Sequence, residues 1–214
     1  LSTYDGLKES ARKGLALATS PNYVAELKID GLSIALTFDQ GQLVRGATRG
    51  DGIRGEDVTV NVRTVRAVPL ALRNGPAGRV EIRGEVYLPK KAFARMNQEQ
   101  EAAGEPLFAN PRNTAAGAMR NLDPSLVAKR GLSAWMYQVV TPAGAGGSED
   151  TGGSKDPPLH SAMLRNLKAW GLAVEPHWRE CDGIDAVMAF CEEWRDKRHD
   201  LAFETDGVVI KLND

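Results

Sequence analysis

Three segments of the chain place charged side chains on one face of a predicted strand and apolar side chains on the other. These segments are residues 25–31, 80–86 and 206–211. In the first of them, Glu26, Lys28 and Asp30 share one face, because successive side chains alternate across a strand. Burying a lysine and two carboxylates without partners would be costly, so this face is expected to line a polar cleft. Lys28 is therefore a candidate nucleophile.

The pattern of apolar and turn-forming positions predicts strands and helices in mixed order. Strands are expected over 23–30, 33–39, 42–48, 79–88, 132–140 and 206–212, and helices over 4–19, 89–103, 124–130, 159–170 and 184–198. Glycines and charges make 49–57 a predicted loop. Residues 142–158 are rich in Gly, Ser, Asp and Pro, which predicts a flexible surface insertion. This order favours an α+β fold, with antiparallel sheets backed by helices.

The composition of the chain bears on the cellular compartment in which it acts and on the partners that it binds. The formal net charge of −1 argues against a protein that bulk positive charge holds to nucleic acid, although a local basic face remains compatible with it. Cys181 and Cys191 lack the spacing of zinc ligands, so no zinc is expected. No apolar run is long enough to span a membrane, and no signal peptide is recognised. We therefore expect a cytoplasmic protein without a membrane partner.

Lys28 can attack only as a neutral amine, and this condition constrains the site. Glu26 and Asp30, which share its face, favour the ammonium form. Activation therefore needs nearby positive charge, from Arg49, Lys211 or a bound Mg²⁺. The alternative is that Lys28 only pairs with Glu26 or Asp30 on a half-exposed sheet.

Other polar positions suggest a site for a phosphorylated nucleotide, but each has a structural alternative. Glu85 could accept ribose hydroxyls or lie on a solvated sheet face. Lys211 could neutralise a phosphate or be exposed. Tyr137 could stack on a base or pack in the core. Arginines near small residues suggest phosphate binding, although scattered surface arginines give the same pattern; they are Arg45, Arg49, Arg54, Arg63, Arg66, Arg112 and Arg120.

Taken together, these segments resemble one family. Lys28-Ile29-Asp30-Gly31 is the Lys-x-Asp-Gly signature of covalent nucleotidyltransferases. The sequences on both sides of it resemble the adenylation domain of bacterial NAD-dependent DNA ligases, in segments 26–31, 47–52, 55–59, 61–64, 83–86, 108–113 and 206–211. The resemblance implies a nucleotidyltransferase or ATP-grasp-like ligase fold around a nucleotide cleft. Residues 1–22 would be a helical lead-in, and 23–214 the adenylation core.

The resemblance also implies a reaction. The family seals nicks in duplex DNA: a lysine takes AMP from NAD and releases nicotinamide mononucleotide, the AMP passes to the 5′-phosphate, and the 3′-hydroxyl displaces it. Lys28 resembles that lysine. Asp30 and Asp206 resemble the carboxylates that assist the chemistry, through Mg²⁺ or Mn²⁺.

Contacts to NAD follow from the same motifs. Glu26 and Leu27 would hold the edge of the adenine, and Tyr137 and Val209 would cover the two faces of its ring. Glu85 would accept hydrogen bonds from the ribose hydroxyls, and Arg49 would lie beside the ribose and Lys28. Lys211 would contact the reacting phosphate. Arg112, Arg120 and Arg198 resemble the arginines that meet the phosphate of nicotinamide mononucleotide or the 5′-phosphate of the nick.

Intact members of the family carry parts that this sequence does not match. These are an N-terminal nicotinamide-binding subdomain, an oligonucleotide-binding barrel, a zinc module and helix-hairpin-helix repeats. We therefore expect a monomeric fragment of a replication and repair enzyme, which does not seal nicks alone and self-adenylates weakly with NAD. The alternatives are a covalent nucleotidyltransferase that uses ATP or GTP, and a non-catalytic module that binds nucleic acid.

Overall fold

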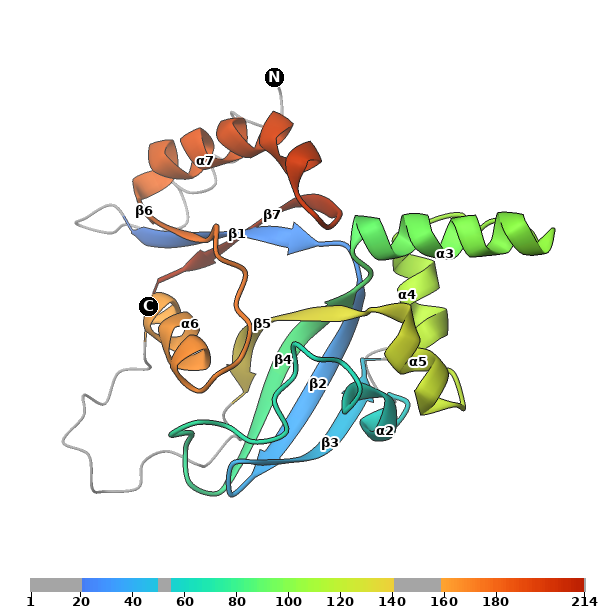
Figure 1. Ribbon diagram of the computed structural model, residues 1–214. Coiled ribbons are helices and arrows are strands. Elements are labelled where there is room, and N and C mark those ends of the chain that lie inside the picture. Colours follow the sequence, from blue (N-terminus) through green and yellow to red (C-terminus); the bar gives the residue numbers. More distant parts are fainter. Residues whose placement is uncertain (1–20, 50–54, 141–158, 214) are drawn as a thin grey trace.

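Two antiparallel sheets form the framework of the chain (Figure 1). The structure is a computed structural model that describes residues 21–49, 55–140 and 159–213. The three-stranded sheet has the order β6-β1-β7, from Arg179–Asp182, Asn22–Ile29 and Thr205–Leu212. The four-stranded sheet has the order β3-β2-β4-β5, from Gln42–Thr48, Leu32–Asp39, Arg79–Tyr87 and Ser133–Val140. The predicted α+β class is confirmed.

Helices cover these sheets on their outer sides and at their ends (Figure 1). In chain order they are α2 (Thr59–Val62), α3 (Lys90–Ala103), α4 (Pro111–Met119), α5 (Pro124–Arg130), α6 (His160–Ala169) and α7 (Gly183–Lys197), followed by the 3₁₀ turn η1 (Arg198–Asp200). The starts of α4 and α5 are capped by Asn110 and Asp123, whose side chains accept hydrogen bonds from backbone N–H groups. Within the described residues, no helix combines the length and apolarity that crossing a bilayer requires.

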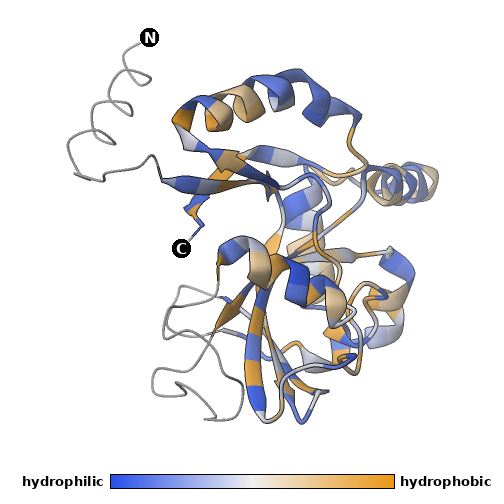
Figure 2. Cartoon of the chain, turned by 90° about the vertical axis from the view of Figure 1, so that its left-hand side faces the viewer, coloured by the Kyte–Doolittle hydropathy of each residue, from blue (hydrophilic) through white to orange (hydrophobic). Residues whose placement is uncertain are grey.

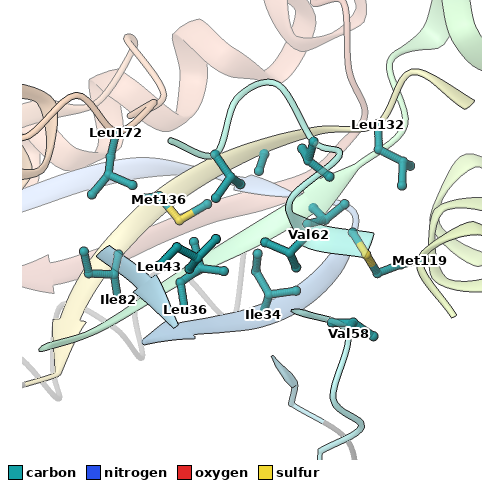
Figure 3. Close-up of a cluster of buried hydrophobic side chains, with 14 of the residues drawn as sticks. Ile34, Leu36, Leu43, Val58, Val62, Ile82, Met119, Leu132, Met136 and Leu172 are labelled. Atoms are coloured by element: carbon teal, nitrogen blue, oxygen red, sulfur yellow. The ribbon is translucent and has the colours of Figure 1, made fainter. Parts of the chain in front are cut away.

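Each sheet has its own hydrophobic core. The larger core packs on the four-stranded sheet and includes Ile34, Leu36, Val62, Ile82, Met119 and Met136 (Figure 3). Polar and apolar residues alternate along these strands, which leaves one face of the sheet for the core (Figure 2). The smaller core lies between α7 and the three-stranded sheet, where Phe190 and Trp194 meet Ala25 and Leu27 of β1.

The predicted strands and helices that fall on described residues are confirmed, with ends that differ by at most one residue. Three elements, α2, α4 and β6, were not predicted from the sequence. The α4 segment consists largely of small residues without a clear apolar stripe, and three of the four residues of β6 are charged. The predicted helix over 4–19 and the predicted insertion over 142–158 lie outside the described residues, as do residues 50–54 of the predicted loop.

Candidate active site

A cleft of about 320 Å³ opens between the two sheets, and it brings the predicted nucleotide contacts together. Its walls come from β1 and β7 on one side and from β2, β4 and β5 on the other. The lining residues are Glu26, Leu27, Lys28, Ile29, Ser33, Arg49, Glu85, Arg112, Tyr137, Val209 and Lys211. Every residue that the resemblance assigns to the AMP half of NAD is in this set. Ile29 and Ser33 were not predicted.

Strand β1 delivers the candidate nucleophile to this cleft. Its alternation directs Glu26 and Lys28 into the cleft, while Ala25 and Leu27 pack under α7. Strand β7 runs antiparallel beside it and sets Lys28 opposite Gly207. A Cβ atom built on Gly207 would meet no atom within 4 Å, so the space next to Lys28 on β7 is open.

Lys28 forms an ion pair with Asp206, which neither of the two sequence interpretations of Lys28 included. Its Nζ lies 2.8 Å from Oδ1 and 2.7 Å from Oδ2 of that carboxylate. Asp30 is engaged elsewhere, because Arg112 donates to its Oδ1 over 3.1 Å. The suggested pairing of Lys28 with Glu26 or Asp30 is therefore wrong: the carboxylate comes from the neighbouring strand, which strand spacing alone does not reveal.

Glu26 is buried in the cleft between two nitrogen-bearing side chains. Its Oε1 lies 2.7 Å from Nε2 of His160 and 2.8 Å from Nζ of Lys211. Burial by itself would raise the pKa of Glu26, but the hydrogen bond with His160 and the ammonium of Lys211 outweigh burial and lower that pKa. Glu26 is therefore an anionic acceptor. His160 belongs to no motif that the sequence analysis used.

Glu85 faces the cleft from β4, and its pKa shifts in the opposite direction to that of Glu26. Burial raises its pKa to about 7, which the charges of Arg112 and Lys28 only partly oppose, while Asp30 and Asp206 add to the increase. Gly31 lies directly beside it, since a Cβ atom there would be 2.3 Å from the carbonyl oxygen of Val86 and 2.9 Å from Cγ of Glu85. The glycine of the Lys-x-Asp-Gly signature thus lets the β1–β2 turn approach β4.

The raised pKa of Glu85 predicts a pH dependence of stability. The carboxyl has a pKa of about 7 when folded and 4.5 as its reference value, so ionisation is penalised only in the folded state. The free energy of unfolding should fall as the pH rises from 4.5 to about 7. The Glu85→Gln variant should lack this part of the fall and gain stability relative to the original chain across the window. Urea unfolding at several pH values measures it, and parallel pH profiles would contradict it.

Tyr137 lines the cleft, so the alternative that it packs in the core is wrong, while its stacking on a base stays a prediction. Its hydroxyl is 3.2 Å from Oγ of Ser33, and Nζ of Lys211 lies 5.4 Å from the centre of its ring. Burial raises the pKa of Tyr137, so the phenol is neutral near pH 7. The ring is thus held by its hydroxyl within a wall of the cleft.

The four arginines that the resemblance places beside the ribose or a phosphate, Arg49, Arg112, Arg120 and Arg198, divide into two groups. Arg49 and Arg112 line the cleft. Arg120 pairs with Glu56 beside a separate pocket formed by residues 56–61 and 120–124. Arg198 lies at the end of α7, and its buried Nε has no hydrogen-bond partner among the described residues. The structure therefore joins Arg112 to the cleft and leaves Arg120 and Arg198 outside it.

The described residues contain no group of three or more His, Cys, Asp and Glu side chains that could hold a metal ion. Asp206 contacts Lys28 and Asp30 contacts Arg112, and both of these partners line the cleft. Mg²⁺ is commonly held by one or two carboxylates together with substrate phosphates and water. These two carboxylates fit such a site only together with a phosphorylated substrate.

Comparisons with known proteins identify relatives of the chain. The sequence profile described as NAD-dependent DNA ligase adenylation domain matches residues 5–214. A DNA ligase of Desulfitobacterium hafniense strain Y51 is 48% identical over 208 residues, which are 97% of this chain and 30% of that protein. A DNA ligase of Natranaerobius thermophilus is 50% identical over 196 residues, or 92% of this chain and 28% of that protein.

The chain thus spans about 30% of the length of the curated relatives that it matches. Among solved structures, a mycobacterial DNA ligase D complexed with ATP and MES covers 90% of this chain and 49% of its own, with 15% identity and a TM-score of 0.45.

Proposed function

Because the chain belongs to the family of NAD-dependent DNA ligase adenylation domains, we propose that its cleft binds NAD and that Lys28 becomes adenylated there. The observation that carries this proposal is the meeting of Glu26, Lys28, Glu85, Tyr137 and Lys211 in one cleft, although they come from four different strands. A chance cluster of surface charges would not combine a lysine, ribose-accepting carboxylates and an aromatic wall.

The cleft offers a contact for each part of an adenylyl group. Tyr137 and Val209 provide surfaces for the two faces of the adenine ring, and Glu26 with Leu27 meets the edge that carries its amino group. Glu85 accepts hydrogen bonds from the ribose hydroxyls. Arg49 and Lys211 supply positive charge for the phosphates.

In the proposed reaction, Nζ of Lys28 attacks the adenylyl phosphorus of NAD. A P–N bond forms, the P–O bond to nicotinamide mononucleotide breaks, and the attacking nitrogen passes a proton to the carboxylate of Asp206, which contacts it. Asp206 also orients Nζ through its two short contacts, while Arg49 and Lys211 place positive charge in the same cleft, where it would stabilise the phosphoryl oxygens. Mg²⁺ or Mn²⁺, held by Asp30 and Asp206 with substrate phosphates, would add positive charge next to the phosphoryl oxygens.

Two alternatives receive less support. An ATP-using nucleotidyltransferase would share Lys-x-Asp-Gly, but the profile that matches nearly the whole chain is that of the NAD-dependent family. A non-catalytic module would not need a lysine in the cleft next to nucleotide contacts. The net charge of −1 also disfavours a stand-alone binder of nucleic acid, because affinity that is independent of sequence depends on neutralising phosphates.

Calorimetric titration of the chain with NAD and with ATP, both with Mg²⁺, tests the substrate. We expect heat from NAD and little from ATP. Heat from ATP alone would move the chain to the ATP-using relatives. Absence of binding by either nucleotide would contradict the placement of Glu26, Lys28 and Glu85 around one ligand.

The chain spans about 30% of the length of its relatives, so the later steps of the reaction concern the whole protein. We propose that the AMP on Lys28 passes to the 5′-phosphate of nicked duplex DNA, with Arg112, Arg120 and Arg198 meeting phosphates, in a cytoplasmic enzyme of replication and repair. The isolated chain is expected to adenylate itself weakly and to seal no nicks. A gel assay on a nicked duplex measures this, and ligated product from this chain alone would contradict it.

A further inference from the structure

His160 reaches the candidate nucleotide site from outside the sequence motifs. It is the first residue of α6, which lies beside β5 and near the end of β7 (Figure 1). The side chains of His160 and Glu26 are only 12% and 11% exposed. A contact of 2.7 Å between them is therefore largely shielded from water, where a hydrogen bond to a charged group is strong.

The contact distances determine which atom carries the hydrogen. The lowered pKa of Glu26 makes its carboxylate an acceptor. A separation of 2.7 Å from Nε2 of His160 then requires a hydrogen on that nitrogen, because two lone pairs would repel each other at this distance. Nζ of Lys211 lies 3.3 Å from the same Nε2, so these two nitrogens are neighbouring donors and not a donor and an acceptor. Both of them donate to Oε1 of Glu26.

The start of α6 is fixed by its neighbours, so the ring has a defined position. The backbone N–H of Ser161 donates to Oδ1 of Asn213 over 2.9 Å, and the backbone N–H of Asn213 donates to the carbonyl of Asn22 over 2.9 Å. Ser161 is fully buried. These bonds tie the residue after His160 to the ends of β7 and β1, the two strands that carry Lys211 and Glu26.

Lys211 and His160 hold Glu26 in different ways. Lys211 reaches Oε1 from β7 on a flexible four-carbon stem, and its side chain is 29% exposed. The ring of His160 stands next to the buried Ser161, whose backbone N–H is bonded to Asn213, so the ring N–H stays directed at Oε1. With both donors on Oε1, the second oxygen, Oε2, is the one that can accept from a ligand.

We propose that His160 is a positioning residue for adenine recognition, which fixes Oε1 of Glu26 and so keeps Oε2 for the 6-amino group of adenine. This inference rests on the proposed function, since it deepens the assignment of the same cleft. It predicts that His160 matters for ligands that carry the amino group and not for those that lack it.

The test compares two ligands by calorimetry on the 214-residue chain: AMP, and purine riboside 5′-monophosphate, which lacks only the 6-amino group. The original chain should prefer AMP by about tenfold or more, as expected for a hydrogen bond to a charged group. His160→Ala should lower the affinity for AMP by about tenfold and leave the affinity for the analogue within about twofold. His160→Gln, whose amide can donate to Oε1, should retain most of the preference.

Lys168→Ala is the control, because it removes a basic side chain from the last turn of the same helix, away from the start of α6 that holds His160 and Ser161. It should keep the preference for AMP. An unchanged preference in His160→Ala, or an equal loss for both ligands, would overturn the positioning role while leaving the proposed function intact. Absence of AMP binding by the original chain would overturn the proposed function as well.

Discussion

Replacing Lys28 with alanine is expected to abolish the covalent AMP adduct that the chain forms with NAD, a loss of at least about a thousandfold in the rate of adenylation. The reason is chemical: Lys28 is the lysine that lines the cleft beside Asp206, and alanine has no nucleophilic atom to replace Nζ. Transfer of labelled adenylate from NAD to protein measures the effect.

Lys28→Arg separates charge from nucleophilicity. Arginine keeps the positive charge and can still pair with Asp206, but its guanidinium stays protonated and does not attack phosphorus. We expect no adduct in this variant, while AMP binding stays within about threefold of that of the original chain, because the adenine and ribose contacts are unchanged. Adduct formation by either variant would show that another residue is the nucleophile.

Replacing Phe190 with alanine is expected to reduce the free energy of unfolding by about 3–5 kcal/mol. Phe190 is fully buried and joins α7 to β1, the strand that presents Glu26 and Lys28 to the cleft. The guanidinium of Arg179 also lies 5.1 Å from its ring. Removing the ring leaves a cavity beneath the nucleophile strand, so the adenylation rate should fall along with stability. Urea unfolding measures the loss.

Leu122→Ala provides the control for this loss, because Leu122 is 99% exposed and its truncation should change stability by no more than about 0.5 kcal/mol. Phe190→Leu keeps part of the buried volume and should cost roughly half as much as alanine or less. If Phe190→Ala were no less stable than Leu122→Ala, the smaller core would not be what supports β1.

Local patterns predicted most of the fold, because they record which face of each element is buried. Strand β1 shows this directly: the alternation of Glu26 and Lys28 with Ala25 and Leu27 separates the cleft from the core under α7. The same logic failed for α4, where small residues form a helix without a recognisable stripe, and for β6, a short charged edge strand.

The candidate site was predicted as a set of residues but not as a set of contacts. Motifs identified Lys28 and Asp206 separately, whereas their ion pair depends on the antiparallel register of β1 and β7. His160 carries no motif and reaches Glu26 across 134 positions of sequence, so only the three-dimensional placement of α6 beside β5 and the ends of β1 and β7 reveals it. Tyr137 shows the same limit, since a single aromatic in an apolar strand fits a core as well as a cleft.

Peptide mapping by mass spectrometry, after prolonged incubation of the chain with excess NAD and Mg²⁺, would locate the adenylated residue. Because a covalent adduct accumulates, even slow self-adenylation becomes visible. We expect one AMP group, on the peptide that contains Lys28, together with release of nicotinamide mononucleotide. An AMP group on a different residue, or an adduct formed from ATP but not from NAD, would contradict this expectation.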